Sequence, residues 1–239
     1  MIGIEACATA HYWARSIRAL GHEVKLMPPS YVKPYVKRGK NDAGDAQAIR
    51  EAVTRPTMRF VPVKSTALQP VLMLRRIRDL LIRQRTMLVN ALRAQLSEFG
   101  IIAAQGMANV RVLTTIVRDE NDTRIPPLAR LCLTAIIEQL GDLEARVRVL
   151  EQAIHTWHRA NETSRRLETI PGIGPITASA IAATVTDPTL FSSGRQLAAW
   201  FGLVPRQSSS GGKERLGHIS KQGDPYIRRL LIVGAHGVL

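Results

Sequence analysis

Residues 40–46, Lys-Asn-Asp-Ala-Gly-Asp-Ala, set two carboxylates three residues apart where a helix is predicted to begin. At that spacing Asp42 and Asp45 project from the same face of the helix, close enough to share a cation. A third carboxylate, Glu5, lies in an apolar strand-like run, where an acid fits only at the strand's end. Glutamate on a strand and Asp-x-x-Asp on a helix are typical of the ligands of a Mg²⁺-dependent nuclease fold.

The same acids also have a purely structural interpretation. The helix dipole stabilises carboxylates in a first turn, so Asp42 and Asp45 would only cap and charge the helix. Glu5 would then be a solvated strand end. These three residues alone leave both interpretations open.

The composition favours a nucleic-acid partner. The chain has 239 residues, of which 45% are hydrophobic, enough for one large or two modest domains. Lys and Arg number 33 against 19 Asp and Glu, and the resulting net charge of +14 favours phosphate. The sequence shows no long uncharged apolar stretch, lipidation signal or secretory leader. We therefore expect a soluble, intracellular protein.

The two cysteines are predicted to be structural. Cys7 and Cys132 are far apart in the sequence and lie in apolar surroundings. This favours reduced, buried thiols over a disulfide or a metal site.

The first segment is predicted to contain a βαβ unit. Residues 2–5 and 23–27 have the pattern of strands, and residues 9–20 have that of an amphipathic helix that ends at Gly21. Strands joined in this way usually run parallel, with a right-handed crossover.

A basic stretch leads from this unit into the helix predicted over residues 42–52. Its cations could neutralise phosphates around the acids, although each would also suit an ordinary solvated loop. They are Lys33, Lys37, Arg38 and Lys40.

Two long helices are predicted over residues 65–99 and 128–157, and residues 103–126 between them have no clear pattern. The first has a near-heptad seam of Leu74, Ile77, Leu81, Leu88 and Ala91 and a basic outer face of Arg75, Arg76, Arg78, Arg83, Arg85 and Arg93. The second has a seam of Leu133, Ile136, Leu140, Leu143, Val147, Leu150, Ile154 and Trp157. An intramolecular hairpin and a coiled coil between subunits both satisfy this pattern.

Residues 167–178, Leu-Glu-Thr-Ile-Pro-Gly-Ile-Gly-Pro-Ile-Thr-Ala, have the pattern of a helix-hairpin-helix. The amides near Gly172 and Gly174, at the start of a helix predicted over residues 176–185, could bind a backbone phosphate. An ordinary turn between two helices is the alternative.

Residues 202–224 combine hydroxyls, glycines and cations. Ser210 precedes two glycines, so a phosphodiester could approach it closely, and nearby cations could hold the phosphate oxygens as charge develops. These cations are Lys213, Arg215, His218 and Lys221. A flexible Ser/Gly surface loop is the alternative interpretation.

Together these motifs resemble the DEDD-type insertion-sequence transposases, the Piv/MooV-related recombinases of the insertion-sequence "one-ten" and "eleven-eleven" groups. The N-terminal match is Gly-Ile-Glu-Ala on a strand, a helix, a strand ending in Pro, then Lys-Asn-Asp-Ala-x-Asp-Ala. The C-terminal match is Gly-Leu-x-Pro, Ser-Gly-Gly-Lys and Gly-x-Ile-Ser-Lys-x-Gly-Asp, followed by a helix.

The resemblance implies a fold of α/β plus all-α class in three parts. These are a partial RNase H/RuvC-like domain at 1–62, a helical coiled-coil insertion at 63–162, and a helical C-terminal transposase domain with helix-hairpin-helix and serine loop at 163–239. It favours pairing of the coiled coil between subunits, because the family forms dimers and higher oligomers.

The resemblance also implies the chemistry. Glu5, Asp42 and Asp45 would bind Mg²⁺ as three of four acids, and Ser210 would be the nucleophile, with Ser208 and Ser209 as register alternatives. DNA, a structured guide RNA and a second copy of the chain are the expected partners. The location that the resemblance implies is the bacterial cytoplasm, with association with the nucleoid when bound.

The family's first acid lies upstream of Glu5, and the family continues beyond residue 239. We therefore expect this chain to bind nucleic acid but to recombine poorly, unless another acid such as Glu51 or Asp79 completes the site. A RuvC-like junction resolvase or nuclease, and a non-catalytic nucleic-acid-binding remnant, are the alternative functions.

Overall fold

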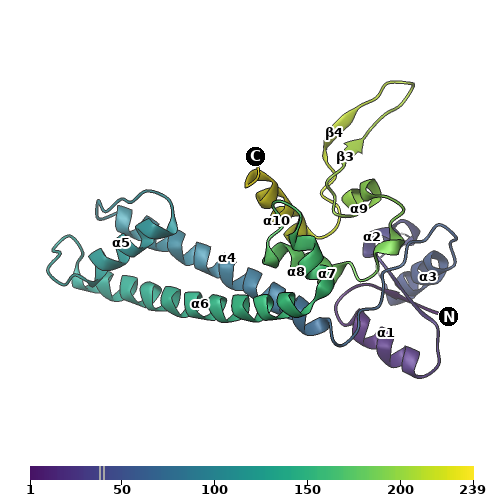
Figure 1. Ribbon diagram of the computed structural model, residues 1–239, viewed down its shortest axis with the longest axis horizontal. Coiled ribbons are helices and arrows are strands. Elements are labelled where there is room, and N and C mark those ends of the chain that lie inside the picture. The colour runs from purple at the N-terminus through teal and green to yellow at the C-terminus, as the bar shows by residue number, and fades with distance from the viewer. Residues whose placement is uncertain (38, 40) are drawn as a thin grey trace. The chain divides into compact units, whose positions relative to one another are not determined.

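A computed structural model describes residues 1–37, 39 and 41–239, and these are mostly helical, with two small sheets (Figure 1). The chain divides into two units. Unit 1 contains Met1–Gln69 and Thr186–Leu190, and unit 2 contains Pro70–Val185 and Phe191–Leu239. This mixture of a few strands with many helices agrees with the predicted class.

Unit 1 is built on a parallel pair of strands. The strands β1 (Ile2–Glu5) and β2 (Val24–Met27) pair in parallel, and α1 (Ala10–Ala19) connects them. The parallel βαβ unit is therefore confirmed. Its remaining elements are α2 (Pro29–Val32), η1 (Lys33–Tyr35), α3 (Asp42–Val53) and η2 (Pro188–Leu190).

The two faces of this sheet contact different helices. Ile2 and Ile4 lie against the cluster that includes the buried alanines of α1. Gly3 faces α3, where an added Cβ would lie 3.0–3.1 Å from side-chain atoms of β2 and α3. Glycine therefore lets α3 approach the strand closely. Because side chains alternate along a strand, Glu5 lies on the α3 face with Gly3.

The longest helices of unit 2 form a hairpin. The helices α4 (Gln69–Ser97) and α6 (Pro127–Ala160) lie side by side and run in opposite directions (Figure 1). Gly100, the predicted stop of the first helix, has a φ of +71°, and its N–H donates to the carbonyl of Ser97. This left-handed residue ends α4 in the way glycine commonly ends helices.

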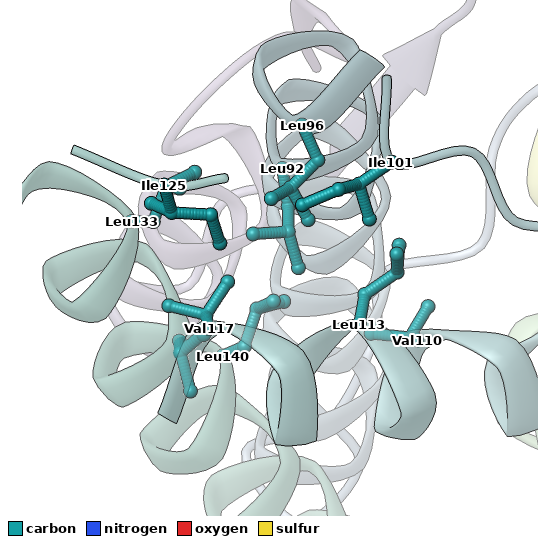
Figure 2. Packing of buried hydrophobic residues seen from close by; sticks show 10 residues of the cluster. Leu92, Leu96, Ile101, Val110, Leu113, Val117, Ile125, Leu133 and Leu140 are labelled. Carbon is teal, nitrogen blue, oxygen red and sulfur yellow. The ribbon is translucent and has the colours of Figure 1, made fainter. Parts of the chain in front are cut away.

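A third helix, α5 (Met107–Arg118), closes the far end of the hairpin. Its apolar side chains interleave with those of α4 and α6 (Figure 2). The cluster consists of Leu92, Leu96, Ile101, Val110, Leu113, Val117, Ile125, Leu133, Ile137 and Leu140. The sequence reading missed α5, although Val110, Leu113 and Val117 have helical spacing.

The predicted seam of α6 is largely correct, but that of α4 is only partly so, because Leu74, Leu81, Leu88 and Ala91 are half-buried rather than buried. Leu140, Leu143 and Val147 are buried, whereas Ile77 of α4 is 42% exposed. α4 instead buries Val71, Leu72, Arg75, Leu92 and Leu96. Arg75 and Arg78 were predicted to face outward, but Arg75 is buried against Asp224 and Arg78 is half-buried against Glu151. An apolar pattern cannot show such charged pairs.

The seam of α6 is covered within the chain, by α4 and α5. The intramolecular hairpin is therefore the correct alternative, and the prediction that this seam bridges subunits through Leu140, Leu143, Val147 and Leu150 is wrong. A homo-oligomer of this protein would need a different surface.

Both cysteines are free, as predicted, but neither is buried. Cys7 follows β1 in an exposed turn, and Cys132 lies on the outer side of α6, next to the inward-facing Leu133. The apolar neighbours of Cys132 therefore misled the prediction, because adjacent helical residues point in different directions.

The C-terminal part of unit 2 contains α7 (Glu162–Glu168), α8 (Pro175–Thr184), α9 (Gly194–Trp200), β3 (Pro205–Gln207), β4 (Leu216–Ile219) and α10 (Pro225–His236). The bend from α6 into α7 is fixed by the buried His158. Its Nδ1 lies 2.8 Å from Oγ of Ser164, and its Nε2 lies 2.8 Å from Oε2 of Glu168.

Arg75 joins α4 to this C-terminal part. Its side chain is only 8% exposed, and its guanidinium donates to the Ala180 carbonyl (3.2 Å), the Thr184 hydroxyl (2.8 Å) and Oδ2 of Asp224 (3.2 Å). It also lies 5.2 Å from the centre of the Tyr226 ring. Burial lowers the pKa of Arg75, and the carboxylate of Asp224 opposes that shift.

Asp224 uses its other carboxylate oxygen to cap α10. Its Oδ1 accepts hydrogen bonds from the backbone N–H groups of Tyr226 (2.8 Å) and Ile227 (3.4 Å). A second pair joins the long helices, since Nε of Arg78 donates to Oε1 of Glu151 at 2.9 Å. Charged pairs therefore connect α4 to both α6 and α10.

We predict that Arg75→Met lowers the free energy of unfolding by about 2–4 kcal/mol, measured by urea denaturation. Methionine keeps most of the volume but leaves Asp224 and two neutral acceptors without their donor. The matched control is Arg76→Met at the adjacent, exposed position, which should change stability by less than about 0.5 kcal/mol. Equal effects of the two changes would contradict a special role for the buried guanidinium.

Candidate functional site

The first candidate site lies in unit 1, at the start of α3. Asn41 is the N-cap, and its side-chain oxygen accepts a hydrogen bond of 2.7 Å from the N–H of Gly44. Asp42 and Asp45 both lie in the first turn, as predicted. Since Asn41 supplies the cap, neither aspartate is needed for that purpose.

The structure brings two of the three predicted acids together. Glu5 and Asp45 line one cavity of about 460 Å³, whereas Asp42 is exposed and does not line it. The other lining residues are Pro29, Ser30, Val32, Lys33, Val36 and Ile49. The cavity thus combines two carboxylates, one ammonium group and one hydroxyl with several apolar side chains.

The carboxylates of Glu5 and Asp45 could hold a magnesium ion only together with other ligands. Among the residues that the structure describes, no three His, Cys, Asp or Glu side chains lie close enough to hold a metal together. Magnesium in phosphate-processing sites is often held by one or two carboxylates, with water and substrate phosphate as the remaining ligands. Glu5 and Asp45 would supply that carboxylate pair.

The other predicted residues of this region divide into three groups. Lys37 is exposed and does not line the cavity, and Arg38 and Lys40 lie outside the described residues. The suggested replacement acids are engaged elsewhere, because Glu51 pairs with Arg55 and Asp79 pairs with Arg83 and Arg229. Lys33, one of the cations predicted to neutralise phosphate near the acids, does line the cavity, and so does Ser30, which no sequence motif indicated.

The second candidate site lies in unit 2 and is a β-hairpin rather than a flexible loop (Figure 1). At its tip Gly211 and Gly212 have φ values of +56° and +74°, which makes a two-residue turn of type I′. The N–H of Lys213 donates to the carbonyl of Ser210 at 3.1 Å. The glycines are thus required by the turn, which holds Ser210 and Lys213 opposite each other at an exposed tip.

The three serines before the turn differ in their hydrogen bonds. The hydroxyl oxygen of Ser209 accepts from Gln207 and from the N–H of Arg215, both at 3.1 Å. The Ser210 hydroxyl has no partner among the described residues and is exposed. The Ser208 hydroxyl likewise has no partner among the described residues, although its backbone N–H donates to the carbonyl of Arg215 at 2.9 Å. Of the two serines nearest the turn, Ser210 therefore has the free hydroxyl.

The base of the hairpin is held firmly. A guanidinium nitrogen of Arg228 donates to the carbonyls of Phe201 (3.0 Å) and Gln222 (2.7 Å). A Cβ added to Gly202 would lie 2.2 Å from the carbonyl oxygen of Gln222, so only glycine allows these backbones to meet. Arg215 and Lys221 are exposed along the hairpin and leave its outer surface basic.

The predicted helix-hairpin-helix residues lie in the turn between α7 and α8. The two glycines there have different surroundings. A Cβ on Gly172 would lie 2.6 Å from the carbonyl oxygen of Gly234 in α10, whereas Gly174 has open space around it. Gly172 is thus needed for packing against α10, whereas Gly174 is exposed at the N-terminus of α8.

Two family models match this chain. The model described as DEDD_Tnp_IS110, transposase, matches residues 1–101, and the model described as transposase IS116/IS110/IS902 family matches residues 164–239. The chain is 49% identical over its whole length to a probable family 20 transposase of Pseudomonas aeruginosa, of which it covers 71%. The chain belongs to the IS110 family of insertion-sequence transposases, a class of DNA recombinase.

Other relatives of this transposase family agree with the assignment. A putative transposase of Sinorhizobium fredii is 47% identical over the whole chain, which covers 61% of that relative. The transposase for insertion sequence element IS1111A of Coxiella burnetii is 39% identical over 99% of the chain, which covers 65% of that relative. The chain thus spans about two thirds of the length of these relatives. The DEDD domain suggests dependence on a divalent metal.

Within the described parts of this transposase, no helix combines the length and the apolar character that crossing a membrane requires.

We predict that Glu5→Gln and Asp45→Asn each weaken Mn²⁺ binding at least tenfold, measured by isothermal titration calorimetry. Each change removes one of the two carboxylates that line the cavity. The matched control is Asp42→Asn, three residues from Asp45 on the same helix, which should have a smaller effect. If Asp42→Asn weakens binding as much as Asp45→Asn, then the metal site differs from the cavity described.

Proposed function

We propose that this transposase cuts and rejoins DNA at the ends of an insertion sequence through Ser210, with assistance from a divalent metal ion. The observation that carries the proposal is the hairpin tip, where a Ser-Gly-Gly-Lys turn exposes one hydroxyl that has no partner among the described residues. Family membership supports the reaction class.

The chemistry follows from the groups at the tip. Oγ of Ser210 attacks a phosphorus atom of the DNA backbone, and the bond from that phosphorus to one deoxyribose oxygen breaks. The proton lost by the serine is balanced by the one that the departing oxygen takes up to become a free hydroxyl. The resulting phosphoserine keeps the energy of the broken bond for rejoining. Lys213 and Arg215, which directly follow the turn, would stabilise the negative charge that develops on the phosphate oxygens.

The acidic cavity of unit 1 has a separate role in this proposal. Glu5 and Asp45 would hold Mg²⁺, which when bound polarises a phosphate oxygen and offsets its charge. Lys33 lines the same cavity and can contact a neighbouring phosphate. Ser30 can position that phosphate through its hydroxyl.

The proposed partners are DNA and a structured guide RNA, bound largely through phosphate. The net charge of +14 and the exposed cations of the hairpin support phosphate binding. Gly174 and the start of α8 would add one backbone phosphate, in the manner of a helix-hairpin-helix. A homo-oligomer is proposed as well, through a surface other than the buried seam of α6.

We predict that Ser210→Ala abolishes the covalent adduct with a radiolabelled insertion-sequence end, detected by denaturing gel electrophoresis. The assay uses full-length protein, because this chain spans only part of its relatives. The matched control is Ser209→Ala, which removes a neighbouring hydroxyl already engaged in the hairpin and should retain the adduct.

Two outcomes would redirect this assignment. An adduct lost in Ser209→Ala but kept in Ser210→Ala would move the nucleophile by one residue. Undiminished strand cutting in variants of all three serines would indicate a RuvC-like nuclease, in which water attacks instead.

We also predict that affinity for DNA falls about 10³-fold or more between roughly 50 and 200 mM salt, because neutralising six or more phosphates releases bound counterions. Fluorescence anisotropy of a labelled duplex measures this directly. Affinity that does not change with salt would contradict binding through the phosphate backbone.

A further inference from the structure

Trp200 stands out among the aromatic side chains of unit 2. It is the last residue of α9 and is 42% exposed, although the next residue, Phe201, is only 4% exposed. It belongs to neither of the candidate sites. An exposed indole immediately before the serine hairpin is therefore available to a partner.

The Trp200 ring is held by two other aromatic rings. Phe191 meets it at a centroid distance of 5.7 Å and an interplanar angle of 68°, and Phe201 meets it at 5.2 Å and 65°. Both contacts are edge-to-face, a favourable geometry for aromatic pairs. Because Phe201 is anchored in the core cluster of α8 and α10, the exposed ring has a fixed support.

The same residue is joined to the base of the hairpin. A Cβ on Gly223 would lie 2.1 Å from the carbonyl oxygen of Trp200, so the two backbones are in direct contact. Lys221 donates its backbone N–H to the carbonyl of Gly202 at 3.0 Å. The backbone of Trp200 and the base of the hairpin are thus packed directly against each other.

The segment that contains this ring is strongly basic. Residues 191–239 contain seven Lys or Arg against two Asp or Glu. Arg195 on α9, Arg206 on β3 and Lys221 beyond β4 are all exposed. Exposed aromatic rings combined with cations that follow a backbone are the usual means of binding single-stranded nucleic acid.

We propose that Trp200 is a stacking platform for an unpaired base in the DNA strand that Ser210 attacks. The inference rests on the DNA-binding function proposed above. The bases of a duplex already stack on one another, so the indole gains a partner only where a base is unpaired. The nearby cations hold the phosphates of that strand, and the ring fixes its position relative to the hairpin.

The first test uses the fluorescence of Trp200 itself. The chain has three tryptophans, so the double variant Trp13→Phe, Trp157→Phe leaves Trp200 as the remaining fluorophore. Titration with an oligothymidylate of about 20 nucleotides, longer than one binding site, should quench this emission as a base stacks on the ring. Binding without any change in the emission would overturn the proposal.

The second test measures affinity. Trp200→Ala should weaken oligothymidylate binding about 5- to 100-fold and duplex binding much less, because stacking is lost but phosphate contacts remain. The slope of affinity against salt should stay unchanged. Trp200→Phe should restore most of the affinity and keeps the aromatic contacts, so it separates stacking from misfolding.

The matched control is Trp13→Ala, which removes a tryptophan of unit 1 that is 53% exposed and should bind as the unchanged protein does. Unchanged affinity in Trp200→Ala would overturn the stacking role and leave the proposed function intact. Failure of the unchanged protein to bind either DNA would overturn the DNA-binding function, and the inference with it.

Discussion

The buried guanidinium of Arg75 is the interaction on which the architecture of unit 2 depends. A charge with 8% exposure is tolerated only when its hydrogen-bonding groups are satisfied, and here a carboxylate, a hydroxyl and a carbonyl do this. The three acceptors come from α8 and α10, while Arg75 belongs to α4. One side chain thus fixes three helices relative to each other, and α10 in turn fixes the base of the serine hairpin through Arg228.

The position of Ser210 depends on contacts at the base of the hairpin and on the turn at its tip. Ser210 lies at the tip of a hairpin that is exposed along its length, so its own packing cannot hold it in place. Its position is set by the type I′ turn at the tip and by the close backbone contacts at Gly202 and Gly223. An accessible tip with a firmly held base suits the nucleophile proposed for Ser210, because a substrate as large as DNA cannot enter an enclosed pocket.

The two candidate sites could be predicted to different extents. Ser210 was singled out from the glycines and cations around it, and its proposed role as nucleophile came from the family resemblance rather than from these residues alone. The strands of its hairpin were missed, because their side chains are exposed and lack an alternating apolar pattern. At the acidic site, spacing on a helix put Asp42 and Asp45 on one face, but only Asp45 reaches the cavity with Glu5. The spacing of two residues on a helix shows which face they share. It does not show which of them lies close enough to the sheet to reach the cavity.

The sequence by itself determined the parallel strand pair, most of the helices with their ends, the basic net charge and the family. Gly21 and Gly100 follow the ends of their helices with positive φ, and alternation along β1 puts Glu5 on the face that α3 covers. Only the tertiary structure decided which face of α4 is buried, that Lys33 lines the acidic cavity, and that the seam of α6 is filled within the chain. The physical reason is the range of the interactions. Caps and turns are made by residues a few positions apart, whereas Arg75 finds Asp224 across 149 positions.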